Sequence, residues 1–171
     1  MHTSRQRSFV MRINSTLAQP PAHVIRGWKS NTSNELPFCI SVMNSMNADR
    51  QRIFQAVTVP EYIETWLSPP GALDGTTVFA SEDSLSIIYR GAENERSRIF
   101  CQYRAVRRSK LLFTWRNVST SDGPASLVKV RLLGDFGRTT VHVTHVGLSS
   151  LEREWHQDLW TASLQRLRNL F

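Results

Sequence analysis

The sequence predicts an α+β protein in which a curved antiparallel sheet of about seven strands wraps around a long C-terminal helix. Seven segments are rich in β-branched and aromatic residues and are separated by turn-forming residues. Two short helical segments follow the first of them, and a long amphipathic segment ends the chain. With 171 residues, 40% of them hydrophobic, the chain is long enough for one domain with a sizeable core.

The first predicted strand is FCISVMNSMN, in which polar and apolar residues alternate. A short helix follows over residues 48–57, because Ile53, Phe54 and Val57 recur at helical spacing. Asn47 is placed to cap this helix by accepting a backbone N–H of its first turn. We therefore expect one strand that passes directly into a helix.

A second short helix is predicted within VPEYIETWLSPPG. Thr58 and Glu61 have the spacing of a capping box, and Pro60 suits the first helical turn because its missing N–H has no partner there. Tyr62 and Trp66 are four residues apart and therefore share a face. The helix must end before PPG, since a residue that precedes proline is disfavoured in the helical region.

Six further strands are predicted in the middle of the chain: TTVFA, SLSIIYR, SRIFCQYRAVRR, KLLFTWRN, SLVKVRLLG and RTTVHVTHVGL. The short connections between them predict an antiparallel meander. Alternation within each strand assigns one set of side chains to the inner face of the sheet. This inward set is Leu85, Ile87, Tyr89, Ile99, Cys101, Tyr103, Leu111, Phe113, Trp115, Val128, Val130, Leu132, Val141, Val143 and His145.

The last predicted element is a helix over about residues 149–170, which begins at Ser149 or Ser150 with Glu152 in its first turn. At about 100° per residue, one face of this helix is apolar and the opposite face is polar. The apolar face comprises His156, Trp160, Ser163, Leu164, Leu167 and Phe171, and Leu151, Trp155, Leu159 and Ala162 extend it. So wide an apolar face needs a broad sheet to cover it.

Four segments carry a resemblance to a known family, and they recur in order over residues 36–171: RIFQAVTVPEYIETWLSPPG, LLFTWR, TTVHVTHVGL and WTASLQRLRNLF. With the order of the elements, they resemble the START/Bet v 1-like (SRPBCC) superfamily. Within it they resemble the branch named for the activator of the Hsp90 ATPase. The resemblance implies the helix-grip fold. One departure is Leu159, at a position where family members often have glycine.

The resemblance also implies a cavity between the sheet and the last helix that accepts a small hydrophobic or amphipathic molecule. A mainly apolar wall with a few polar groups is typical of such pockets. The candidate ligand-binding residues are Trp66, Tyr89, Tyr103, Trp115, His145, His156 and Trp160. The alternative for the aromatic residues is that they form the hydrophobic core.

His145 and His156 are the most informative polar candidates. Alternation along the strand places His145 with the inward set, and the helical wheel places His156 one turn before Trp160. A neutral imidazole offers one donor and one acceptor, which suits ligand orientation or acid–base chemistry. The alternative is that both are partly buried structural residues.

Charge and motifs argue against several other functions. The net charge is +7, but residues 1–34 contain five basic and no acidic side chains, so residues 35–171 are nearly balanced at +2. We therefore expect no nucleic-acid partner. Cys39 and Cys101 are isolated, which predicts free thiols rather than a disulfide or a zinc site. The sequence lacks the common catalytic motifs and paired inward carboxylates, so we assign no catalytic residue, metal or cofactor.

Residues 1–34 are basic and rich in Ser, Thr, Asn and Pro, and predict a disordered N-terminal extension before a domain over residues 35–171. A misplaced gene start and an organelle-targeting segment are the alternatives. No apolar run is long enough to span a membrane, so we expect no membrane insertion and a cytoplasmic location. Outward-facing Phe100 and Ile88 are compatible with a homodimer.

Three classes of function follow as hypotheses. The first is a single-domain protein that binds a small hydrophobic or amphipathic ligand between the sheet and the C-terminal helix. The second is a protein-interaction or chaperone-partner module related to Hsp90 ATPase activators. The third is a cyclase- or hydrolase-like enzyme that uses the cavity histidines. We favour the first class, and we consider a binding protein a better interpretation than an enzyme.

Overall fold

The computed structural model describes residues 37–171 except residues 74, 92, 119–123 and 135–136. The elements follow the predicted order, and the described residues form seven strands and three helices. The strands are β1 (Phe38–Met46), β2 (Thr76–Ala80), β3 (Ser84–Arg90), β4 (Arg96–Arg107), β5 (Lys110–Asn117), β6 (Ser126–Leu133) and β7 (Thr139–Leu148). The helices are α1 (Arg50–Ala56), α2 (Pro60–Trp66) and α3 (Ser150–Arg168).

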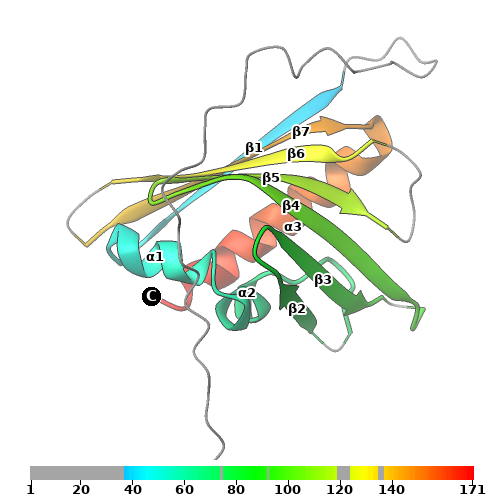
Figure 1. Ribbon diagram of the computed structural model, residues 1–171, viewed down its shortest axis with the longest axis horizontal. Coiled ribbons are helices and arrows are strands. Elements are labelled where there is room, and N and C mark those ends of the chain that lie inside the picture. Colours follow the sequence, from blue (N-terminus) through cyan, green and yellow to red (C-terminus); the bar gives the residue numbers. More distant parts are fainter. Residues whose placement is uncertain (1–36, 74, 92, 119–123, 135–136) are drawn as a thin grey trace, which may run out of the picture. The chain divides into compact units, whose positions relative to one another are not determined.

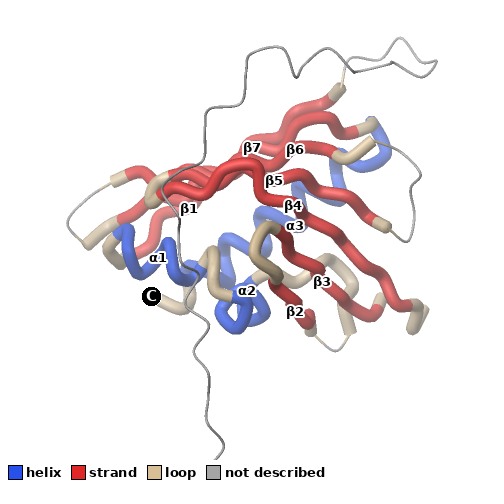
Figure 2. Tube along the Cα trace, viewed as in Figure 1, coloured by secondary structure: helices blue, strands red, loops and turns tan. Residues whose placement is uncertain are grey.

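The strands form one antiparallel sheet in the order β1-β7-β6-β5-β4-β3-β2. Strands β2 to β7 are the predicted meander, and β1 pairs with β7 so that Val42 lies opposite Val143. Figure 1 shows the sheet curving around α3, with α1 and α2 near one end of that helix. Figure 2 shows the same arrangement as a separation of strand and helix layers. This is the predicted helix-grip α+β fold.

An irregularity in β4 accompanies the curvature of the sheet. The register with β5 shifts between Tyr103 and Ala105, so Arg104 is the additional residue, and its side chain is exposed. Such a bulge bends a strand and increases its twist. It also ends the strict alternation along β4, which explains why Tyr103 is half-buried whereas the other members of the inward set are buried.

The predicted caps of the two short helices are wrong in detail. Asp49 rather than Asn47 caps α1, because its carboxylate accepts from the backbone N of Arg52 at 2.9 Å. At α2 the cap position is Val59, which makes no side-chain capping bond. The hydroxyl of Thr58 donates instead to the carbonyl of Phe54 at 2.7 Å. Thr58 therefore completes the last turn of α1 and is not available to begin α2.

Three hydrogen bonds fasten α2 to its neighbours. The indole Nε1–H of Trp66 donates to the carbonyl of Ala56 at 2.8 Å, and Glu64 Oε1 accepts from the backbone N of Val78 at 2.6 Å. Arg166 of α3 donates through Nε to the carbonyl of Trp66 at 3.0 Å. The bonds from Trp66 and Arg166 supply partners for carbonyls at two helix ends, which the helices themselves leave unpaired.

Helix α3 begins after Ser149, one of the two predicted starts, and the structure adds a capping box there. The hydroxyl of Ser149 accepts from the backbone N of Glu152, and the Glu152 carboxylate accepts from the backbone N of Ser149 at 3.0 Å. The predicted apolar face is buried as far as Leu167, but Leu151 is 91% exposed and Ala162 is exposed. Leu151 belongs to the first turn of α3.

Residues 1–36 lie outside the described part of the chain, and with them lies the predicted N-terminal extension. The boundary between residues 34 and 35 stays a prediction. Among the described residues, no helix is both long and apolar enough to cross a membrane.

Candidate functional site

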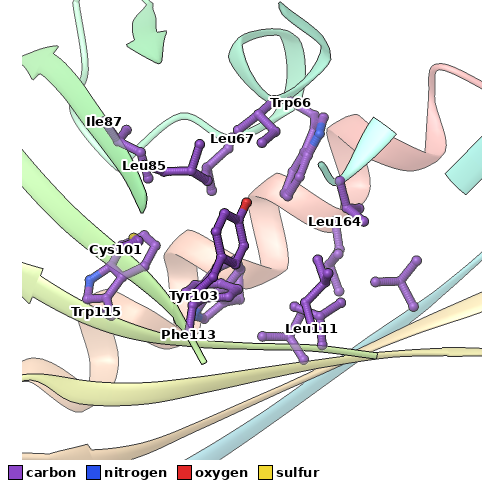
Figure 3. Close-up of a pocket in the computed structure, with 16 residues that line it drawn as sticks. Trp66, Leu67, Leu85, Ile87, Cys101, Tyr103, Leu111, Phe113, Trp115 and Leu164 are labelled. Carbon is purple, nitrogen blue, oxygen red and sulfur yellow. The ribbon is translucent and has the colours of Figure 1, made fainter. Parts of the chain in front are cut away.

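A small apolar cavity lies between the sheet, α2 and α3, and we call it the inner cavity. Its volume is about 30 Å³, so it has room for little more than one water molecule. Figure 3 shows how side chains from the sheet and both helices fill the space around it. It is lined by Val57, Ile63, Trp66, Leu67, Leu85, Ile87, Cys101, Tyr103, Leu111, Phe113, Trp115, Val130, Val141, Val143, Trp160 and Leu164.

A larger pocket of about 370 Å³ lies where the ends of β3, β5 and β7 meet the first turns of α3, and we call it the outer pocket. Its lining mixes aromatic, charged and small polar side chains. It comprises Tyr89, Glu95, Ser97, Trp115, Arg116, Asn117, Pro124, Ser126, Gly147, Leu151, Glu152, Trp155 and His156. Trp115 lines both spaces and therefore separates them. In Figure 3 its indole nitrogen points away from the aliphatic side chains of the inner cavity.

A chain of hydrogen bonds runs through the protein beside the outer pocket. The indole Nε1–H of Trp160 donates to Nδ1 of His145 at 3.2 Å. Because an indole nitrogen only donates, Nδ1 must be unprotonated, and the proton of the neutral ring is on Nε2. That Nε2–H donates to the hydroxyl of Ser126 at 2.7 Å, and the hydroxyl donates to the carbonyl of Trp115 at 3.1 Å.

Both ring nitrogens of His145 are therefore occupied, and the residue is fully buried. Burial, with a further contribution from nearby His156, lowers the pKa of His145 from 6.5 to about 2. The imidazole is thus neutral at physiological pH and has no free lone pair. It holds α3 and β6 together and is poorly suited to act as a base.

His156 is oriented by its own helix. Its Nδ1 lies 2.8 Å from the carbonyl of Glu152, which can only accept, so Nδ1 carries the proton and Nε2 is an acceptor. Burial lowers the pKa of His156, while the hydrogen bond and the charge of Glu152 act in the opposite direction. Among the described residues, Nε2 of His156 and Nε1 of Trp115 are two buried polar atoms that lack a hydrogen-bond partner.

These two unpartnered atoms are close in space and opposite in character. The Trp115 and His156 rings lie 6.1 Å apart, centroid to centroid, at 73°. The exposed fraction is 3% for Trp115 and 6% for His156, so neither nitrogen can be satisfied by bulk water. A buried polar group without a partner typically costs about 1–3 kcal/mol. The pair is therefore a place where an additional polar group would stabilise the protein.

Tyr89 closes the outer pocket on the side of β3. It pairs with Ser97 across β3 and β4, and it is 8% exposed. Burial raises its pKa, the hydrogen bond with Ser97 lowers it, and the charge of Glu95 raises it. The phenol is therefore neutral at physiological pH.

The structure divides the predicted site residues between the two spaces. Trp66, Tyr103 and Trp160 line the inner cavity, Tyr89 and His156 line the outer pocket, and Trp115 lines both. His145 lines neither space, and its ring contacts those of Trp115, His156 and Trp160. Leu159 is fully buried and lines neither space.

Two contributors to this site, Ser126 and Trp155, are not among the residues predicted from the sequence. Ser126 precedes Val128 by two residues in the same strand, so the alternation that placed the inward set also places Ser126 inward. Trp155 was assigned to the apolar face of α3 but not to the pocket that it lines. Its ring contacts that of His156, with centroids 4.8 Å apart. No sequence signal indicates that the outer pocket is the larger space.

Metal and thiol chemistry gain no support from the described residues. Within them, no group of three or more His, Cys, Asp or Glu is placed to hold a metal ion. Cys39 and Cys101 are free thiols, and burial raises the pKa of Cys101, which disfavours the reactive thiolate.

Residues 47–171 match the family described as Activator of Hsp90 ATPase homolog 1-like protein, and the chain belongs to this family. The match begins three residues before α1 and continues beyond the end of α3, so it includes both spaces described above. The family lies within the SRPBCC superfamily of Bet v 1-like folds, as predicted. No curated protein sequence is similar enough to count as a match.

Solved structures show the same fold at low sequence identity. Protein CV1439 from Chromobacterium violaceum is 17% identical with a TM-score of 0.66, and the alignment covers 77% of this chain and 96% of that one. Protein Ms6760 from Mycobacterium smegmatis is 16% identical with a TM-score of 0.65, over 78% and 90% of the two chains. DynU16, described as a putative protein in the dynemicin biosynthetic locus, is 23% identical with a TM-score of 0.56, over 77% and 46%.

Proposed function

We propose that this protein binds a small amphipathic molecule in the outer pocket. The observation that carries the proposal is the difference in volume between the two spaces, about 370 Å³ against about 30 Å³. Pockets for small molecules usually have volumes of about 300–1,000 Å³. The inner cavity between sheet and helix, where the resemblance placed the ligand, is too small without rearrangement.

The lining of the outer pocket supports an amphipathic rather than a purely apolar ligand. Tyr89, Trp115 and Trp155 offer aromatic surface, whereas Glu95 and Arg116 place charges among the lining residues. Such a mixture is typical of sites that combine apolar contact with a few orienting polar groups. A ligand with an aromatic or aliphatic body and one polar end fits this lining.

Thermal-shift measurements and native mass spectrometry of freshly purified full-length protein test the proposal, with a panel of lipids, polyketides and aromatic compounds. A ligand at 100 times its Kd stabilises the folded state by about 2.7 kcal/mol. We expect at least one class to raise Tm, and Leu151→Asp to reduce the shift. Leu170→Asp is the matched control, since Leu170 is also exposed and does not line the pocket. No bound molecule and no Tm shift with any compound would contradict the proposal.

The chaperone-partner hypothesis rests on the name of the family alone. A pull-down with the full-length protein that recovers no Hsp90-type ATPase would count against it. The enzyme hypothesis loses His145 as a base, because both its ring nitrogens are hydrogen-bonded.

A further inference from the structure

The polar atoms beside the outer pocket restrict the chemistry of the ligand that it binds. Trp115 and His156 both line the pocket, and both are more than nine-tenths buried. Among the described residues, Trp115 Nε1 and His156 Nε2 have no hydrogen-bond partner. Both residues line the outer pocket, so a polar group bound there lies beside the two rings.

The two nitrogens have fixed and opposite requirements. The indole Nε1–H of Trp115 can only donate. His156 Nε2 can only accept, since the Glu152 carbonyl holds the proton on Nδ1 at 2.8 Å. The hydrogen bonds of His145 are complete, so it does not compete for the same group.

We propose that the outer pocket recognises a neutral ligand through a hydroxyl group that accepts from Trp115 Nε1–H and donates to His156 Nε2. This inference rests on the proposed function. Two hydrogen bonds of about 2.9 Å that meet at one hydroxyl oxygen at a roughly tetrahedral angle join nitrogens about 4.7 Å apart. Rings whose centroids are 6.1 Å apart can present their nitrogens within that span.

Other polar groups match the pair less well. A carboxylate, ether or ketone accepts hydrogen bonds but cannot donate to His156, and an ammonium group donates but cannot accept from Trp115. The mismatched nitrogen would stay buried without a partner, which is the condition under which polar sites discriminate strongly. The aromatic lining favours a phenol-like ligand within the class of alcohols.

Isothermal titration of the full-length protein at pH 7.5 with 2-naphthol, 2-methoxynaphthalene and 2-naphthoate tests the inference. The three probes share one ring system and differ in whether the polar group both donates and accepts. We expect 2-naphthol to bind at least about tenfold more tightly than either of the others, because each of them leaves His156 Nε2 without a donor.

His156→Asn is the decisive variant. The amide nitrogen of asparagine can take the place of Nδ1 and donate to the Glu152 carbonyl, whereas the acceptor at Nε2 is lost. The preference for 2-naphthol over its methyl ether should then fall to about threefold or less. His142→Asn is the matched control, because His142 lies on the same strand as His145, bonds Ser41 and lines neither space. It should leave the preference unchanged.

Each outcome separates the inference from the proposed function. Similar affinities for all three probes, or a preference that survives His156→Asn, would overturn hydroxyl recognition and indicate that a trapped water joins the two nitrogens. Such binding would still support the pocket as a ligand site. If none of the probes binds, the inference is overturned. The proposed function is then tested separately by the thermal-shift panel of lipids, polyketides and aromatic compounds. If His156→Asn does not fold, Trp115→Phe removes the donor instead, and the probe series in the unaltered protein still decides.

Discussion

Ser126 has the smallest side chain in the series of hydrogen bonds that runs from Trp160 through His145 to the carbonyl of Trp115, and it connects the last two of these groups. Its hydroxyl accepts from His145 and donates to the carbonyl of Trp115, so one residue joins the histidine of β7 to a backbone carbonyl of β5. His145 is fully buried, so bulk water cannot replace this acceptor. The Ser126 hydroxyl is therefore needed to keep the Nε2–H of His145 hydrogen-bonded.

Ser126→Ala should therefore lower the free energy of unfolding by about 1–3 kcal/mol, because it leaves a buried N–H without an acceptor. Urea denaturation followed by circular dichroism measures the change. Ser81→Ala is the control, since Ser81 lies in an exposed turn and its loss should cost about 0.5 kcal/mol or less. Equal effects of the two substitutions would show that the buried chain is not as constrained as its distances indicate.

Acid should destabilise the protein through its buried histidines. The pKa of His145 is lowered to about 2 in the folded state, so between that value and 6.5 the unfolded chain binds a proton that the folded chain does not. The contribution of His145 to stability is therefore present above pH 6.5 and is lost as pH falls below that value. Between pH 7.5 and 5.5, His145 alone should remove on the order of 1 kcal/mol, and His156 acts in the same direction.

Urea denaturation at pH 7.5, 6.5 and 5.5 measures this loss. A total loss below about 0.5 kcal/mol would mean that the folded state accepts the proton at little cost.

At the scale of the elements, α2 is held by side chains rather than by its own length. It has seven residues, which is too short to be stable alone. Glu64 joins it to β2, Trp66 joins it to the end of α1, and Arg166 joins its C-terminal end to α3. Arg166 also donates to the carbonyl of Ser68, so it holds the connection that leaves the helix.

Arg166→Met should lower the free energy of unfolding by about 1–3 kcal/mol, since it leaves the carbonyls of Trp66 and Ser68 without these donors. It should also speed proteolytic cleavage between α2 and β2, which limited proteolysis measures. Arg168→Met is the matched control, because Arg168 is an exposed arginine in the same turn of α3 and should have little effect. Unchanged cleavage in Arg166→Met would assign the position of α2 to its apolar contacts alone.

At the scale of the whole molecule, the interior of the sheet is a packed core and the open space lies at its end. Trp115 marks the border, because it lines both the inner cavity and the outer pocket. Leu164 and Leu151 are on the same helix but on opposite sides of this border, with exposed fractions of 1% and 91%.

Leu164→Ala should therefore cost about 2–5 kcal/mol, as expected when a filled core loses three carbon atoms. Leu151→Ala should change stability by about 0.5 kcal/mol or less. Urea denaturation of both variants checks the contrast. A cost below about 1 kcal/mol for Leu164→Ala would show that the inner cavity is loosely packed and able to open for a ligand.

The sequence by itself determined the elements, their order and the inner face of the sheet, because periodicity of two and of 3.6 residues is a local property of the chain. It also placed His145 and His156 toward one interior. It misplaced two helix caps, since Asp49 caps α1 in place of Asn47, and Thr58 bonds the end of α1 while α2 begins without a side-chain cap.

The tertiary structure alone decided which space is open. The volume of a cavity depends on how side chains from several elements interlock, and no single segment records it. The same packing gave Ser126 its two partners and left Trp115 and His156 without one, although nothing in their local sequence distinguishes them. The predicted site residues therefore divide between the inner cavity and the outer pocket. Which of them belong to the packed core and which to the candidate binding site depends on how α3 packs against the sheet.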